Sequence, residues 1–458
     1  MDMKIKLNRP TARELGFLFK KRNKCEPPPE SKIYHCKTPS PVNAVPEFDP
    51  MGGVLIAYPG TIARPRNQIQ LPPAGPRAFG IPEELIIRME QLDSGQPVHI
   101  FIMCADQDQK SYVINSLTAT AASKKLKFDP NLIHFVAWDT DTYWTRDYGP
   151  WWIYNKTTGY FGIAKHLYTS LGGGSVGLVE GAEKVNPMEG SGIFRPNDDY
   201  GADKLSDFLN APIRKWNNAN WNNSKKLPPI NVHNWYNTGL LDVGGNYMVT
   251  GDGIIASSYL VATQNELPVY IEDQTTDPCV RTIEERMLYI LEQLNRFMGV
   301  HTYHVLTDPS GTYIGHIDCW GKFLAPRTIL IAQSENKQVN EAYNRIAKTF
   351  EDEDFIVYRV MCQDIYVPIA DQPDTTAAYT NSLILNDHVY VPIAGGQYKN
   401  WDVDALSVYR QALPDHTIVG IEGKAEYPWL GTDAMHCRTR AIPRAVVDNW
   451  LKSQMLKQ

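Results

Sequence analysis

The chain has 458 residues, of which 43% are hydrophobic and 21% charged, a composition typical of a globular protein able to bury a large core. Lys and Arg number 45 against 51 Asp and Glu, which gives a formal net charge of -6. This balance argues against a nucleic-acid partner and suits a protein that handles small cations or basic side chains. No apolar run reaches about 18 residues, so no membrane insertion is expected.

Cysteine usage and the first residues leave the compartment open. The seven cysteines form no CxxC pair, which excludes a zinc ribbon and a thioredoxin-like motif. Cys25 and Cys36 could form a disulfide or stay as two buried thiols. The opening MDMKIKLNRP lacks the apolar segment of a signal peptide. Loops rich in Trp, Tyr and Asn nevertheless slightly favour secretion.

The first 46 residues are predicted to form a basic, Pro-rich N-terminal arm. Eight Lys or Arg precede Cys25, and this charge run is expected to be a solvated surface. A compact domain over 47–458 is expected to begin near Glu47. Within it, the stretch at about 171–229 is predicted to be an insertion that serves as a binding lid or as decoration.

A unit of two strands, a helix and a further strand recurs along the compact domain. Strands are predicted at 52–58, 98–103 and 133–136, and helices at 82–92, 109–125 and 280–297. The order strand, turn, strand, helix returns at 316–350 and at 381–413. About five such ββαβ units predict an α/β fold that closes as a pseudo-symmetric five-bladed propeller. An open doubly wound sheet would be expected to carry a Gly-rich phosphate-binding loop of the pattern GxGxxG. Gly172-Gly173-Gly174 does not fit this pattern.

The stretch from Tyr143 to Trp152 is aromatic-rich, broken by Arg146-Asp147 and turned by Gly-Pro. Aromatic side chains offer a flat face to a delocalised cation, and a carboxylate beside a sharp turn can point into a cleft. The stretch therefore suggests a pocket for a planar cation. The alternative is an aromatic core strand in which Arg146 and Asp147 make a local ion pair.

Three further stretches place reactive side chains at the edges of apolar strands: 315–320, 379–384 and 431–439. If His316-Ile317-Asp318 is a strand, its first and third side chains face the same side. A surface ion pair is the simpler interpretation of such a pattern. Cys437 stands between His436 and Arg438, whose positive charges would favour its thiolate.

Together these stretches resemble the guanidino-group-modifying superfamily, and within it the microbial-type peptidylarginine deiminases of the agmatine deiminase clan. WTRDYGPW, GGNYM, HIDCW, YTNSLI and GTDAMHCRT occur in the family's order and cover most of the chain from Gly52 onward. The resemblance implies the pentein fold, a five-bladed α/β propeller. It implies hydrolytic deimination of peptide or protein arginine to citrulline with release of ammonia. The site residues that it implies are Cys437, His316, Asp147 and Asp318, with Asn381 in support and Trp144 as the aromatic wall.

The chemistry expected from the resemblance is coherent. Two carboxylates can grip a guanidinium from different edges while a Cys437 thiolate attacks its central carbon. His316 would donate a proton to the leaving ammonia, leaving a covalent thiouronium that water then hydrolyses. No cofactor and no metal are expected, calcium included. The expected partners are peptides or proteins that contain arginine.

One departure from the family's pattern concerns the far end of the substrate. The family places two arginines near a PND element to hold the carboxylate of a C-terminal arginine. Here Arg195 is present, but Ile193 stands where the other arginine is expected. Strict C-terminal preference is therefore not expected, and internal arginines become acceptable substrates.

Four other interpretations remain open. An agmatine or free-arginine deiminase would use the same four residues, and a catalytically inactive arginine-binding protein would keep the scaffold. A thiol peptidase could use Cys437, His316 and Asn381, although two buried carboxylates would repel its oxyanion. A metal site could draw on histidines and a nearby cysteine, but two of these histidines face opposite ways on the predicted strand. The residues in question are His301, His304, His316 and Cys319.

Overall fold

A computed structural model provides the structure of the chain. It describes residues 4–7, 41–59, 79–90, 95–105, 107–168, 196–220, 225–233, 238–265, 283–309, 314–367, 372–423, 429 and 433–455. All structural statements below concern these residues. Cys25, Cys36 and Cys279 lie outside them.

Five sheets repeat one pattern, in which an antiparallel pair of strands is extended by a parallel strand. The first sheet runs β20 (Arg440–Pro443), β3 (Met51–Ala57), β4 (His99–Met103), β5 (Ile133–Val136). The second runs β2 (Val42–Ala44), β6 (Trp152–Asn155), β7 (Tyr160–Ala164), β8 (Asn231–His233). The third runs β9 (Met248–Val249), β10 (Ile254–Ser258), β11 (Thr302–Leu306), β1 (Lys4–Leu7).

The last two of these sheets have three strands each. One runs β12 (Gly321–Ala325), β13 (Thr328–Gln333), β14 (Ile356–Met361), and the other runs β17 (Leu383–Leu385), β18 (His388–Ile393), β19 (Thr417–Glu422). A separate hairpin joins β15 (Asp364–Val367) to β16 (Gln372–Thr376). Its strands follow β14 and precede β17 in the chain.

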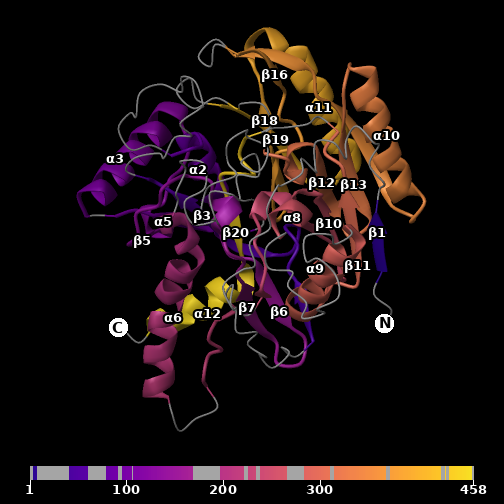
Figure 1. Ribbon diagram of the computed structural model, residues 1–458. Coiled ribbons are helices and arrows are strands. Elements are labelled where there is room, and N and C mark those ends of the chain that lie inside the picture. The colour runs from indigo at the N-terminus through magenta and orange to yellow at the C-terminus, as the bar shows by residue number, and fades with distance from the viewer. Residues whose placement is uncertain are drawn as a thin grey trace.

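Helices fill the crossovers between parallel strands, because a parallel connection must return across the sheet. They are α2 (Glu83–Glu90), α3 (Gln107–Lys124), α6 (Gly201–Ala219), α8 (Leu260–Gln264), α9 (Ile283–Met298), α10 (Lys337–Glu351) and α11 (Lys399–Ala412). The remaining α-helices are α4 (Thr145–Tyr148), α5 (Pro196–Asp199) and α12 (Arg444–Gln454). In Figure 1 the long helices lie on the outside of the sheets. This arrangement confirms the predicted α/β fold of five ββαβ units.

The first sheet joins segments from opposite ends of the sequence. β20 pairs antiparallel with β3, with Arg440 opposite Leu55 and Ala441 opposite Val54. β3 is buried along its whole length because strands cover both of its edges and α12 packs across it. The ring of sheets is therefore closed by pairing between an early strand and a late one.

Two predicted boundaries need correction. β1 and β2 lie in the predicted arm over residues 1–46, yet they pair with β11 and β6, so the sheets begin before the predicted boundary. The predicted insertion at 171–229 contains α6, which fills the crossover from β7 to β8 and is part of the repeated unit. The sequence of α6 gives a weak helical signal, because Pro212 lies inside the helix and Asn217 and Asn218 lie near its end. Residues 169–195 and 221–224 lie outside the described chain.

Membrane insertion was not expected from the sequence. Among the described helices, none combines the length and the hydropathy that a membrane span requires.

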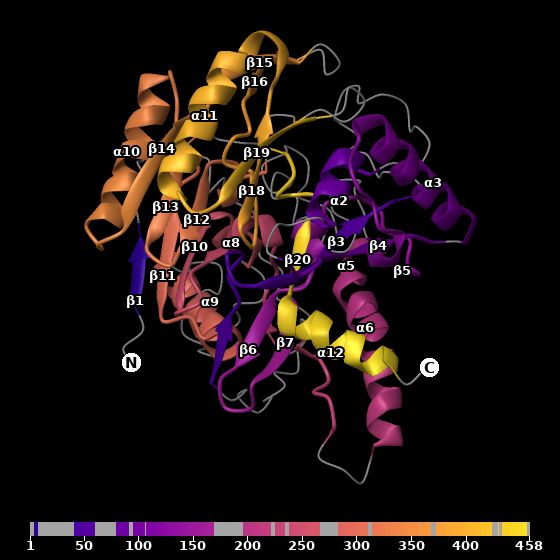
Figure 2. The same cartoon turned by 180° about the vertical axis from the view of Figure 1, so that it is seen from behind.

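The contact of α12 with α6 and β3 gives a test of the fold (Figure 2). Trp450 is 5% exposed, and its ring centroid lies 5.3 Å from that of Phe101 and 4.7 Å from that of His134. Because Trp450→Ala leaves a cavity, it should lower the free energy of unfolding by ~3–5 kcal/mol in denaturant titrations. Met455, 69% exposed just beyond the same helix, is the control. Met455→Ala should change stability by less than ~0.5 kcal/mol, and equal losses would contradict the packing.

Candidate active site

Asp147 is presented by the short helix α4. The aromatic stretch around it forms a helical turn rather than the alternative core strand, and this turn ends where the Gly149 N–H donates to the Thr145 carbonyl. Asp147 Oδ1 accepts a hydrogen bond from the Gly245 N–H at 3.2 Å. The indole N–H of half-buried Trp144 donates to Asp433 Oδ2 at 3.0 Å. The stretch thus binds to two distant segments that also carry predicted site motifs.

His316 and Asp318 reach the same place, although the predicted strand is wrong. His316 is extended, and Ile317–Cys319 form a 3-10 turn. A Cβ placed on Gly245 would lie 2.6 Å from His316 Nδ1, 2.9 Å from Asp147 Oδ1 and 3.2 Å from Asp318 Oδ2. His316 Nδ1 is 3.8 Å from Asp147 Oδ1. Gly245 therefore leaves the space around which three predicted site residues converge.

Asn381 holds the sulfur of Cys437 in this group. Its Nδ2 donates to Cys437 Sγ at 3.0 Å and to the Asp318 carbonyl at 3.3 Å. Its Oδ1 accepts the N–H groups of Cys437 and Ala434, both at 3.1 Å. Cys437 Sγ lies 3.4 Å from Asp318 Oδ2. The structure thus brings together all five residues that were predicted to be catalytic.

The surroundings of Cys437 disfavour its thiolate, contrary to the prediction that its neighbours favour it. Burial raises the pKa of Cys437 well above its ordinary value, and the negative charges of Asp318 and Asp433 raise it further. The adjacent cations are engaged elsewhere, because Arg438 pairs with Asp433 at 2.8 Å and His436 lies between two carboxylates. A further positive charge is needed to ionise the sulfur.

His316 is buried without hydrogen bonds. It is 2% exposed, and neither ring nitrogen has a hydrogen-bond partner among the described residues. Leaving a buried polar group unsatisfied costs about 1–3 kcal/mol. Such a cost is typical of a group whose partner is a substrate or a water molecule.

Glu47 was not predicted to belong to the site. Its Oε1 accepts hydrogen bonds from Lys322 Nζ at 2.8 Å and from the Ile384 N–H at 2.7 Å. Its Oε2 lies 3.0 Å from an Arg146 terminal nitrogen and 2.7 Å from His436 Nε2. Burial opposes the ionisation of Glu47, but these cations outweigh it and hold its pKa well below the ordinary value. A lone Glu at a predicted domain boundary gives no sequence signal of this role.

His436 links Glu47 to Asp318, which lies beside Cys437. Its Nδ1 contacts Asp318 Oδ2 at 2.7 Å, opposite the contact of Nε2 with Glu47. Burial opposes the ionisation of Asp318, yet the hydrogen bond from His436 and the nearby positive charges lower the pKa of Asp318. The only sequence signal for His436 was its position next to Cys437.

Other predicted residues are less well placed or not described. Ile193 and Arg195, predicted to bind the substrate's far end, lie outside the described chain. Trp144 stays a prediction as the pocket wall. The described His, Cys, Asp and Glu side chains include no group of three or more that could hold a metal ion.

Comparison with known proteins finds similarity over part of the chain. The model of the Porphyromonas-type peptidyl-arginine deiminase family matches residues 284–443. A curated agmatine deiminase of Medicago truncatula is 25% identical over 230 residues, which are 44% of this chain and 56% of that protein. The match thus spans little more than half of that relative's length.

Solved structures share the fold over most of the chain. The agmatine deiminase of Enterococcus faecalis aligns with a TM-score of 0.59 and 19% identity, over 88% of this chain and 96% of that one. A structure described as a putative arginine deiminase from Porphyromonas gingivalis aligns with a TM-score of 0.56 and 17% identity, over 88% and 99%. At these identities the alignments establish the fold.

The space at Gly245 gives a direct test of the site. Gly245→Ala should lower turnover of a guanidinium substrate by ~100-fold or more, because the new methyl group occupies the place where Asp147, Asp318 and His316 converge. Gly321→Ala is a matched control, since its Cβ would meet atoms no closer than 3.6 Å. The measurement is ammonia release by both folded variants. Full activity of Gly245→Ala would contradict the site.

The ionisation of Cys437 gives a second test. The thiolate absorbance that is present in the wild type and missing in Cys437→Ala should appear only above the ordinary cysteine pKa of about 8.5, because burial and Asp318 disfavour the anion. Asp318→Asn should shift this midpoint to lower pH, since it removes one negative charge. A wild-type midpoint below ~8.5 would contradict the account.

Proposed function

We propose that this chain belongs to the guanidino-group-modifying pentein deiminases and hydrolyses the guanidinium of arginine residues in peptides or proteins. The products are citrulline and ammonia, and the intermediate is a thiouronium on Cys437. This proposal is finer than the comparisons, which include deiminases of more than one guanidinium substrate.

One observation carries the proposal: the buried thiol of Cys437 lies beside the carboxylate of Asp318, which converges with that of Asp147 on the space at Gly245. Cys437 Sγ is 3.4 Å from Asp318 Oδ2, and Asp147 Oδ1 also borders the space at Gly245. A guanidinium is planar, permanently charged and carries five N–H donors, so it suits two carboxylates at different edges. A thiol peptidase would gain nothing from negative charge beside its oxyanion.

Binding of the cation would supply the charge that the resting thiol lacks. A positive group beside Cys437 favours the thiolate and offsets the effects of burial and Asp318. The thiol proton passes to His316, and the sulfur adds to the central guanidinium carbon to give a tetrahedral adduct. His316, which has no hydrogen-bond partner among the described residues, protonates the departing nitrogen, and ammonia leaves while the C–S bond stays in place.

Water completes the reaction. His316, now neutral, accepts a proton from a water molecule, and the oxygen attacks the thiouronium carbon. The C–S bond breaks and the sulfur returns as the thiolate. The product side chain is a neutral urea group, which no longer pairs with Asp147 and Asp318 and is therefore released. One water is consumed and one ammonia is formed in each turnover.

The two candidate functions, a peptidylarginine deiminase and an agmatine deiminase, differ in the size of their substrates. The match of residues 284–443 to the Porphyromonas-type family favours a peptidyl substrate, whereas a curated relative and a similar solved structure are agmatine deiminases. We place the peptidyl substrate first because GTDAMHCRT, which carries Cys437, lies within the matched segment. Substitution of an arginine by Ile193 suggests that internal arginines are accepted.

The test compares citrulline or carbamoyl product release from four substrates with a calcium chelator present. The substrates are a peptide with an internal arginine, a peptide ending in arginine, free arginine and agmatine. Peptide turnover should occur without calcium, and Cys437→Ala should reduce it by more than ~10⁴-fold, because covalent catalysis is lost. Cys362→Ala, which removes another buried thiol, should retain activity.

Each of the other possible outcomes of this test would contradict a part of the proposal. Turnover of agmatine alone would replace the peptidyl proposal by the small-molecule one. No turnover of any substrate, combined with measurable binding of arginine peptides, would leave an arginine-binding protein. Equal activity of Cys437→Ala and the wild type would overturn the assignment of the nucleophile.

A further inference from the structure

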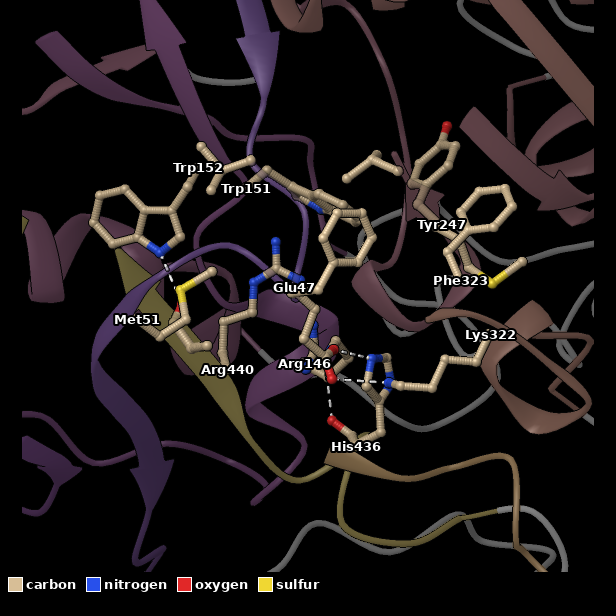
Figure 3. Close-up of a pocket in the computed structure, with 15 residues that line it drawn as sticks. Glu47, Met51, Arg146, Trp151, Trp152, Tyr247, Lys322, Phe323, His436 and Arg440 are labelled. Carbon is tan, nitrogen blue, oxygen red and sulfur yellow. Dashed lines mark hydrogen bonds and ion pairs between the residues drawn. The ribbon is translucent and has the colours of Figure 1, made fainter. Parts of the chain in front are cut away.

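A second cavity lies beside the active-site network and has no role in the proposed reaction. Its volume is about 50 Å³, and its lining includes Glu47, Arg146, Lys322, Arg440 and Trp151. Figure 3 shows these side chains arriving from several different strands and loops. None of the five predicted catalytic residues lines it.

The lining of this cavity carries more positive charges than negative charges. Glu47 is already shared by Arg146 and Lys322, at 3.0 Å and 2.8 Å. His436, which also lines the cavity, contacts Glu47 and Asp318 and so draws on the same negative charge. Among the described lining residues, three permanent or near-permanent cations therefore face a single carboxylate.

Arg440 is the lining cation that forms no ion pair with a described carboxylate, although Glu47 acts on it at longer range. It is 6% exposed, and its Nε donates to the Pro150 carbonyl at 2.7 Å. Its guanidinium carbon lies 4.4 Å from the centre of the Trp151 ring. No described carboxylate forms an ion pair with it, and its terminal nitrogens donate no hydrogen bond to the described residues. In Figure 3 this guanidinium extends into the cavity.

A buried guanidinium without an ion-pair partner does not become neutral by losing its proton. Burial and the neighbouring Arg146 lower the pKa of Arg440 well below its ordinary value, but arginine stays protonated in proteins. An unpaired buried charge is costly, and the cost is offset when an ion of opposite sign occupies the space beside it. The unused terminal N–H groups would supply hydrogen bonds to that ion.

The dimensions limit what the ion can be. A water molecule needs about 10–15 Å³ of such volume, so about 50 Å³ accommodates a small ion with little accompanying water. The aromatic rings of Trp151 and Tyr247 wall the space and leave no room for a large organic anion. We propose that this cavity binds a small inorganic anion, of the size of chloride, against the guanidinium of Arg440.

The test measures thermal unfolding of the full chain in sodium chloride and in sodium gluconate at equal ionic strength. Because an ion that binds only the folded state stabilises it, chloride should raise the midpoint by about 2 °C in the wild type, with saturation. Arg440→Gln should lose this response. Arg359→Gln is the matched control, since Arg359 also donates to backbone carbonyls but lies outside the cavity.

A second measurement keeps the proposal testable if Arg440→Gln does not fold. Wild-type crystals soaked in sodium bromide should show anomalous scattering beside the Arg440 guanidinium. Equal midpoints in chloride and gluconate, or an identical chloride response in Arg440→Gln, would overturn the proposal. Bromide found elsewhere with an empty cavity would overturn it as well. Neither readout depends on deiminase activity, so the proposal can fail while the proposed function holds.

Discussion

The carboxylate of Glu47 is the contact on which the geometry of the site depends. It lies just before β3, yet it is bonded from α4 through Arg146, from β12 through Lys322 and from β17 through the Ile384 N–H. His436 carries the contact on to Asp318. Loss of this one anion would leave several buried cations unpaired, which is far more costly than loss of a surface ion pair. Parts of separate blades are thus held in register by one side chain.

The two charged regions around Glu47 have opposite character. Several of the described groups near Cys437 are carboxylates, which together with burial raise the pKa of its thiol. A cation bound there would favour the thiolate. Toward Arg440 the described groups are rich in cations, and Glu47 is their single carboxylate. Arg146 and His436 belong to both regions, so a charge that enters one region acts electrostatically on the other. This link rests on contacts of 2.7–3.0 Å rather than on a long pathway.

The sequence predicted the repeated units well because their signals are local. The apolar spacing over 280–297 indicated the helix that is α9, and the strand at 133–136 is β5. The convergence of His316, Asp318 and Cys437 was predicted from the family resemblance, although the local geometry at His316 was wrong because Ile317–Cys319 make a turn. Glu47 and Arg440 could not be predicted, since their partners lie hundreds of residues away in the sequence.

The pairing of β20 with β3 determines when, during synthesis, the residues around Cys437 can come together. Cys437 lies three residues before β20, so the pairing that joins the two ends of the sequence also brings this thiol to the other site residues. During synthesis, Asp147, His316 and Asn381 all leave the ribosome before Cys437. The group of side chains around Cys437 is therefore complete only after β20 has paired with β3.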